Sequence, residues 1–325
     1  MQHSNSIYKL TALWAFAECS LGGLMHLFKI PFTGFFVGGF AVIIIGLIAH
    51  FSSQNFKTIL QSTIIVILVK AAVSPQSPPP AYFAVLFQGF FGAIIFGGLG
   101  FNKISACLFG AVAMIESSLQ MIISKTIFYG MSFWKAIDLL FKNILKDFGL
   151  DSNISFSFWL ILSYVSLYAI WGFLLGIWSA KLPNKLSSKW TIVSKEISSI
   201  NLETLPENKR TYKTFKWLGV LFTLVFIITI LWLNGEKKWD AVFIVLRTIA
   251  VIGLLYFVVA PFIKHLIKKY SANRQNQIND IVNDLPQIKQ TAQLAFALAG
   301  KNKKGISKYL EFVWILITLT LYHEA

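Results

Sequence analysis

The stretch PFTGFFVGGFAVIIIGLIAHF, residues 31–51, decides the fold class of this chain. It carries no Asp, Glu, Lys or Arg over about 20 residues, which is the length that an α-helix needs to cross a bilayer. Similar runs recur along the chain, so 56% of all residues are hydrophobic and only 13% are charged. The runs are continuous and do not alternate, so we expect an all-α polytopic membrane protein and not a β-barrel.

The apolar runs fall into two groups with a basic segment between them. Six predicted spans make up the first group, at 8–28, 31–51, 56–73, 81–101, 104–124 and 156–180. Three more make up the second group, at 214–233, 239–263 and 306–321. We therefore expect a six-span domain at 1–182, a basic linker at 183–213 and a second membrane domain at 214–325. Residues 131–150 are amphipathic and are expected to lie at the membrane interface.

The placement of charge predicts the orientation of the chain. Of the net charge of +15, a large share lies in 181–213 and 264–274, whereas the proline-rich loop 74–80 has none. Because basic loops stay in the cytoplasm, we expect both segments and the N-terminus on the cytoplasmic side of the cell (inner) membrane. The first apolar run leads directly into a second, so no cleavable signal peptide is expected. Lys70, near the outer end of its span, is expected to extend to the outer surface.

Residues 279–304, NDIVNDLPQIKQTAQLAFALAGKNKK, form a long helical pattern that does not resemble a membrane span. Its apolar residues recur at steps of three and four and make one stripe, at Ile281, Leu285, Ile288, Ala292, Ala295 and Ala299. Asp284 followed by Pro286 suits the start of a helix, and Gly300 suits its end. Two interpretations stay open: a helix that docks on a partner protein, which we adopt, and a helix that rests in the lipid headgroups.

Polar side chains inside the apolar spans are the candidates for function, because a charge at the centre of a span costs about 3 kcal/mol on insertion scales. The candidates for substrate binding are Glu18, His26, Gln88, Glu116 and Gln120. Glu18 and His26 share one helix face, and Glu116 and Gln120 form an i, i+4 pair. If these groups converge, they line a small polar pocket that opens to the outside. Otherwise each makes an interhelical hydrogen bond and does nothing more.

Chemistry beyond binding is not indicated by the sequence. His26, Glu18 and residues 1–3 are conceivable metal ligands, but one histidine with scattered carboxylates is a weak pattern, and we assign no metal site and no cofactor. Cys19 and Cys107 lie in apolar runs and indicate neither a disulfide framework nor a metal cluster. The chain has no GxxxxGK[ST] phosphate loop and no HExxH motif, so we expect it to hydrolyse no ATP by that route and to be no enzyme.

The first half resembles the substrate-binding S component of energy-coupling factor (ECF) transporters. S components are compact six-span bundles. The residues that carry the resemblance are the small residues of the first span, such as Ala12 and Ala15, and the stretches 24–39 and 74–93. The small residues are similar to the Ala-rich face by which S components dock on their partner. The resemblance implies that this half binds the substrate from outside.

The second half resembles a shortened T component, the transmembrane coupling subunit of the same transporters. The stretch 241–261, with Arg247, is similar to a T-component span, and 285–300 is similar to a coupling helix that starts at a proline and ends in Ala-Arg-Gly. Here Ala299 is followed directly by Gly300, and Lys301 is the nearest cation. The residues to which the resemblance assigns partner coupling are Pro286, Lys289, Ala292, Ala295, Ala299, Gly300 and Lys301.

Together the two resemblances imply one membrane component of an ATP-driven importer of a small micronutrient: a vitamin, a vitamin precursor or a transition metal. The implied partners are cytoplasmic ATPase subunits of ABC type, the small-molecule substrate and membrane lipid, and not nucleic acid. Two rivals stay open. One is an ion-coupled secondary carrier in which Glu18 and Glu116 exchange protons, and the other is an integral membrane enzyme or assembly factor.

Overall fold

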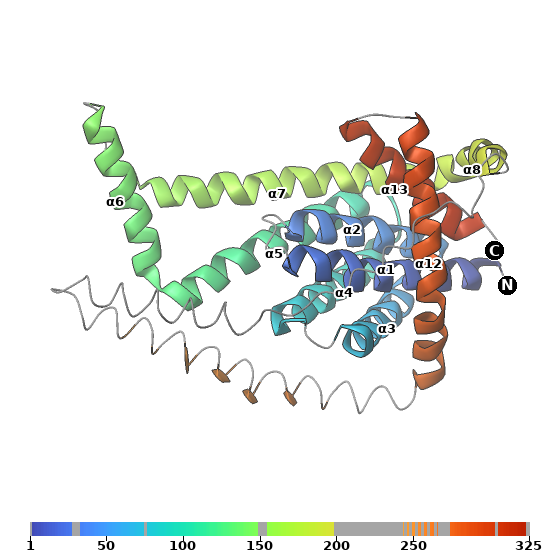
Figure 1. Ribbon diagram of the computed structural model, residues 1–325, viewed down its shortest axis with the longest axis horizontal. Helices are drawn as coiled ribbons and strands as arrows, with labels where there is room; N and C mark the ends of the chain where they lie inside the picture. Colours follow the sequence, from blue (N-terminus) through green and yellow to red (C-terminus); the bar gives the residue numbers. More distant parts are fainter. Residues whose placement is uncertain are drawn as a thin grey trace. The chain divides into compact units, whose positions relative to one another are not determined.

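The structure is a computed structural model, and it describes residues 2–27, 33–74, 77–148, 155–197, 274–302 and 305–322, with scattered single positions between 243 and 265. The elements in these ranges are α-helices (Figure 1). The helices before the basic linker are α1 (Gln2–Leu27), α2 (Thr33–Phe51), α3 (Asn55–Val73), α4 (Pro79–Leu99), α5 (Lys103–Tyr129), α6 (Met131–Asp147) and α7 (Phe156–Lys181). They are followed by α8 (Pro183–Ile197), α12 (Gln275–Asn302) and α13 (Ile306–Tyr322).

Among the described helices, α2, α3, α4, α5 and α7 are the 5 that are long and apolar enough to cross a membrane. Helices of this length and composition indicate a membrane-embedded protein. The first predicted span is helix α1, whose opening turns are polar, and the last predicted span is α13, with 17 residues. The predicted spans 214–233 and 239–263 lie outside the described residues, apart from single helical positions from 243 onward.

Two compact units divide the chain. The first consists of 1–121, 159–203 and 262–325, and the second of 122–158 and 204–261. The first unit therefore joins most of the predicted six-span half to helices from the predicted second membrane domain. Helix α8 lies inside the predicted linker and packs on α13, where Lys189 forms an ion pair with Glu311. The stacked rings of Trp190 and Tyr322 add to the same contact.

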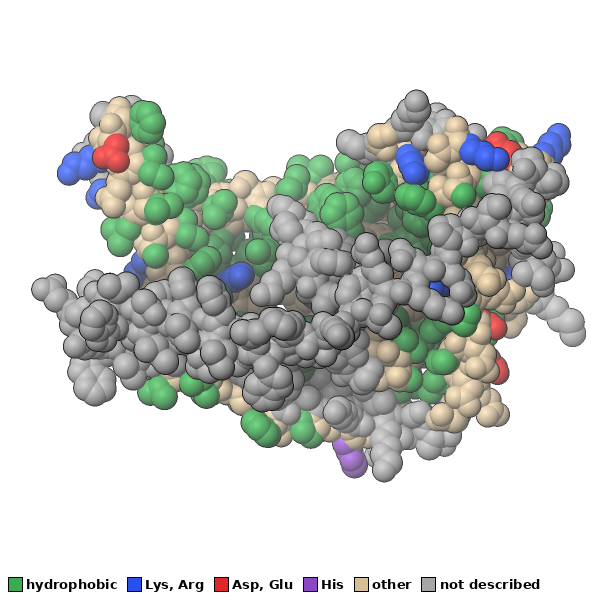
Figure 2. Space-filling model, viewed as in Figure 1, with side chains coloured by type: hydrophobic (Ala, Val, Ile, Leu, Met, Phe, Trp, Pro, Cys, Tyr) green, Lys and Arg blue, Asp and Glu red, His purple; other side chains and the backbone are tan. Residues whose placement is uncertain are grey.

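Helix α2 is the centre of the first unit. Every residue from Val37 to Ala49 is buried, and this helix packs against α1, α3 and α4. Its uncharged run of Ile, Val, Phe and Gly is apolar on all sides, which is the composition of a helix that neighbours enclose. Outer helices have one apolar face turned away from the bundle. Figure 2 shows hydrophobic side chains along α7, where Phe158, Trp159 and Ile170 are each more than half exposed.

Glycines set the distance between α5 and α7. A Cβ built on Gly110 would lie 2.1 Å from the carbonyl oxygen of Gly172, and one built on Gly176 would lie 2.4 Å from that of Ala106. The two backbones can approach this closely only because neither helix has a side chain at the crossing. The glycines of α4 differ in what surrounds them. Gly89 does meet Thr63 of α3, whereas Gly98 has nothing within 4 Å of its built Cβ.

Helix α12 packs on α1, α3 and α13 (Figure 1). Helix formation over most of 279–304 is confirmed, but both predicted ends are wrong. The helix begins at Gln275, so Pro286 lies inside it and not in its first turn behind an Asp284 cap. It continues through Gly300 to Asn302, and the chain turns at Gly305 with a φ of 65°, a conformation that glycine adopts without strain.

In the second unit, the end of α5, helix α6 and the first turn of α7 form a helical corner. Residues 131–150 were expected to be an amphipathic helix, and α6 is one, with no buried residue of its own. Asp138 of α6 accepts hydrogen bonds from the backbone N–H (2.6 Å) and the hydroxyl (2.9 Å) of Ser157. These bonds lower the pKa of the Asp138 carboxyl, because they favour its charged form. Asp138 thus satisfies an N–H that the first turn of α7 leaves free.

Candidate functional site

A buried ion pair joins α1 to α3. The Lys70 Nζ donates to Glu18 Oε2 at 2.8 Å, and the two side chains are only 4% and 6% exposed. The expectation that Lys70 extends to the outer surface is therefore wrong. A lysine with a carboxylate neighbour in the same apolar bundle is stabilised by pairing with it, since an unpaired buried charge is far more costly than a paired one. The partner could not be inferred from the residues around Lys70, because it lies 52 residues away in the sequence.

The ion pair belongs to a polar layer at the end of α3. Lys70 also reaches the carbonyl oxygen of Ala81 at 3.4 Å, and its amino group lies 5.9 Å from the Tyr82 ring centre. The Tyr82 hydroxyl donates to the Ser74 carbonyl at 3.2 Å, which ties the start of α4 to the end of α3. A cation in the last turn of α3 is also stabilised by the negative end of that helix. The layer lies beside the uncharged residues Ser74, Ser77 and Pro78, which precede α4.

Two further polar contacts fix the register of these helices. The Thr11 hydroxyl donates to the Ser62 hydroxyl at 2.9 Å, about two turns from the Glu18–Lys70 pair on the same two helices. Gln88 of α4 donates from Nε2 to the Ser117 hydroxyl of α5 at 3.3 Å. A Cβ on Gly38 of α2 would lie 2.9 Å from that same Nε2, so α2 closes over the Gln88 amide.

Glu116 is the least satisfied of the predicted site residues. Its side chain is buried, and within the described residues neither carboxylate oxygen has a hydrogen-bond partner. The Gln120 Nε2, one turn further along α5, is also buried without a partner. The expected i, i+4 spacing is present and sets the Gln120 side chain beside the carboxylate, yet no hydrogen bond of normal geometry joins the two groups. A buried carboxylate without partners is costly to the fold, so it is a candidate for binding a ligand that supplies the missing donors.

The structure thus brings the predicted residues together only in part. Glu18 is paired with Lys70 and Gln88 with Ser117, and no hydrogen bond or ion pair among the described residues joins these two pairs to each other or to Glu116. The backbone of His26 belongs to α1, but its side chain lies outside the described part of the structure, as do Met1 and the side chains of Gln2 and His3. The described side chains contain no group of three or more metal-binding residues.

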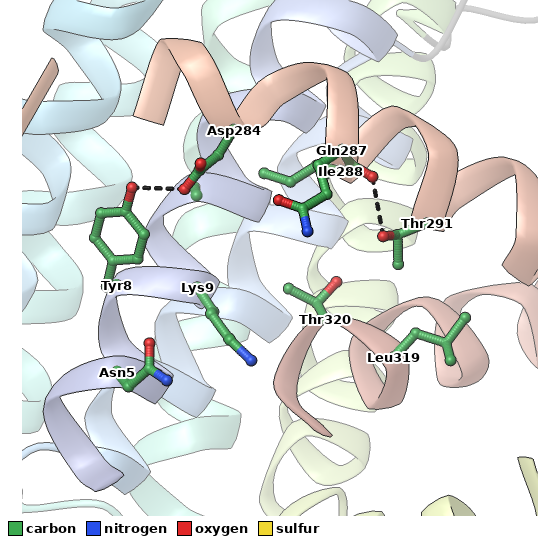
Figure 3. Close-up of a pocket in the computed structure, with 10 residues that line it drawn as sticks. Asn5, Tyr8, Lys9, Asp284, Gln287, Ile288, Thr291, Leu319 and Thr320 are labelled. Carbon is green, nitrogen blue, oxygen red and sulfur yellow. Dashed lines mark hydrogen bonds between the residues drawn. The ribbon is translucent and has the colours of Figure 1, made fainter. Parts of the chain in front are cut away.

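A polar cavity that the sequence analysis missed lies between α1, α12 and α13 (Figure 3). Its volume is about 240 Å³, and its polar lining includes Tyr8 and Lys9 of α1, Asp284 and Gln287 of α12, and Thr320 of α13. The Tyr8 hydroxyl donates to Asp284 Oδ2 at 2.7 Å. The available signal was the polar row Asp284, Gln287 and Thr291, which runs beside the apolar stripe at helical spacing.

The predicted coupling residues fall on two sides of α12. Ala295 and Ala299 are fully buried and Ala292 is partly buried, so this part of the stripe packs within the chain itself. Pro286, Lys289, Gly300 and Lys301 are exposed. The partner that the stripe meets in the structure is therefore the bundle, and a second, polar face remains on the outside of the helix.

In comparisons with known proteins, no family model, no curated protein and no solved structure matches this chain.

Proposed function

We propose that the chain is the membrane component of an ATP-driven ECF-type importer, which binds a small micronutrient and couples to separate cytoplasmic ATPase subunits of ABC type. The observation that supports it best is the seat of α12 on α1 and α3. An importer of this kind needs a helix that a cytoplasmic motor can move and that is attached to the substrate-binding bundle. Helix α12 is attached in this way through its buried stripe and the Tyr8–Asp284 hydrogen bond.

Helix α1 connects the Tyr8–Asp284 contact with the Glu18–Lys70 pair. Tyr8 and Glu18 both belong to α1, so a displacement of α12 that moves α1 acts on the buried ion pair. In the proposed mechanism the substrate enters from the side of loop 74–80 and is held by the polar layer of Glu18, Lys70 and Tyr82. ATP binding in the partner subunits moves α12, and α1 transmits that movement to the layer.

The exposed face of α12 is the proposed contact for the ATPase subunits. Lys289 and Lys301 are exposed and lie off the buried alanine stripe, so they can meet acidic groups on a partner. Because both lysines are exposed in the described part of the structure, their substitution is expected to leave the fold intact. This separates the coupling function from the packing function of the stripe.

The test is a pull-down of the tagged full chain from its native host in mild detergent, with mass spectrometry of the co-purifying proteins. We expect ATPase subunits with the wild type, and clearly less of them with the double variant Lys289→Glu and Lys301→Glu. The matched control is Lys57→Glu, an exposed lysine of α3. A wild-type chain that is pure and folded but brings no ATPase subunit contradicts the proposal.

Glu116 favours a second candidate, an ion-coupled secondary carrier. A buried carboxylate without a partner is able to take up and release a proton or a small cation during a transport cycle. This candidate predicts uptake into vesicles that contain the purified chain alone, driven by an ion gradient and lost with Glu116→Gln. Uptake that requires added ATPase subunits and ATP decides against it.

A further inference from the structure

The cavity between α1, α12 and α13 contains two opposite charges that do not pair with each other. Lys9 donates to the Leu321 carbonyl at 3.4 Å, and no carboxylate among the described residues lies within ion-pair distance of it. Asp284 accepts the Tyr8 hydroxyl and likewise has no cation at that distance. In the view of Figure 3 the amino group of Lys9 points away from Asp284. Both residues are only half-buried, so both charges remain accessible from the cavity.

The rest of the cavity lining has a polar part and an apolar part. Gln287 and Thr320 add an amide and a hydroxyl near the charges, whereas Ile288 and Leu319 are buried and apolar. Convergent polar groups over an apolar base are the usual composition of a small-ligand site. The volume of about 240 Å³ is enough for a ligand of roughly amino-acid size.

The charges define the chemistry of that ligand. A simple anion would suit Lys9 but would be repelled by the Asp284 carboxylate, and a simple cation would meet the opposite problem. A zwitterion satisfies both, with its anionic group on Lys9 and a primary ammonium on Asp284. We propose that this cavity binds a zwitterion with an anionic group and a primary ammonium. Because the chain has helices long and apolar enough to cross a membrane, the zwitterion available to it there is a phosphoethanolamine group, whose anion is a phosphate.

Two sources supply this chemistry: the headgroup of phosphatidylethanolamine (PE) and a free soluble phosphoethanolamine. Two other phospholipids separate the contributions of the charges. Phosphatidylcholine has the same phosphate, but its quaternary ammonium has no N–H to donate to Asp284. Phosphatidylglycerol has the phosphate and no cation. The site should therefore prefer PE over both, a preference that bulk charge or acyl chains alone do not produce.

The experiment measures the thermal unfolding of the purified full chain in detergent with each lipid in turn, and with free O-phosphoethanolamine. We expect PE to raise the melting temperature above that with phosphatidylcholine or phosphatidylglycerol, and Lys9→Ala and Asp284→Asn each to weaken PE binding about tenfold. Lys57→Ala, on the exposed side of α3, is the matched control and should keep the preference. A shift with PE but not with the soluble compound identifies the lipid as the source, and a shift with both identifies the headgroup as sufficient.

Native mass spectrometry of the wild-type chain in an equal mixture of the three lipids gives a second measurement that needs no variant. Retention of PE above the other two supports the site. Equal retention of all three lipids, or a PE preference that survives in both variants, would overturn it. The readout is lipid selection and stability, so it does not depend on any ATPase partner and fails independently of the proposed transport function.

Discussion

Lys70 of α3 donates to Glu18 of α1 at 2.8 Å, inside a bundle where both side chains are almost fully buried. Each residue alone would be an uncompensated charge in an apolar environment, and together they hold α1 and α3 in register. The pair also connects the end of α3 with the start of α4 through Ala81. The Glu18–Lys70 pair therefore contributes both to the stability of the fold and to the proposed binding layer.

Removing one partner of this pair should destabilise the chain strongly. We expect Lys70→Met to lower the free energy of unfolding by about 3–5 kcal/mol, because it leaves the Glu18 carboxylate buried and unpaired. The double variant Glu18→Leu and Lys70→Met should recover much of that loss, since neither charge remains. Thermal unfolding of the purified chain measures both. Lys189→Met is the control: its pair with Glu311 is more exposed, so the loss should be about 1 kcal/mol or less.

Glu116 should respond in the opposite direction to Glu18. Within the described residues its carboxylate has no hydrogen bond of normal geometry, so Glu116→Leu removes a desolvation cost and only a weak contact with Gln120. We expect the melting temperature to rise by a few degrees, whereas Glu18→Leu lowers it. In the carrier mechanism, ion-driven uptake should be lost in Glu116→Leu. Equal destabilisation by the two substitutions would show that Glu116 has a structural partner.

The α5–α7 crossing should tolerate no side chain. Gly172→Ala places a Cβ 2.1 Å from the carbonyl oxygen of Gly110, which is backbone and cannot rotate away. We expect a loss of several kcal/mol or failure to fold, measured by the yield of monodisperse protein and its melting temperature. Gly98→Ala, at a helical glycine with open space around it, should be neutral or stabilising by up to about 1 kcal/mol. Similar effects of the two substitutions would contradict the crossing as the cause.

Asp138 should protect the first turn of α7. We expect Asp138→Ala to speed amide hydrogen exchange in residues 155–160 several-fold at neutral pH, because the Ser157 N–H loses its acceptor. Asp147→Ala, an exposed acid of the same helix, is the control. The pKa of Asp138 is lowered in the folded chain, so its stabilising contribution is present above the ordinary carboxyl pKa and is lost as the pH falls through the lowered value. Unchanged exchange in the variant would show that the bond does not hold this turn.

Some of the candidate site could be predicted from sequence and some could not. Glu18, Gln88 and Glu116 could be identified from sequence because they lie inside apolar runs, where a polar side chain is costly unless it has a partner or a function. Their partners could not be predicted in the same way. Ser117 is an ordinary residue for a span, and Lys70 looked like a residue of the outer surface until α3 was seen packed against α1.

The amino-acid sequence by itself determined the helical class of the chain, the positions of the five long apolar helices and the existence of a helix over most of 279–304. These are local properties, because the hydrophobic period and the length of an apolar run can be read within a single segment of the chain. The tertiary structure alone decided that the stripe of α12 is covered by the chain itself, that Gly110 meets Gly172, and that Lys9 and Asp284 line one cavity. Each of these joins residues far apart in the chain, and helix packing, not local composition, sets which of them meet.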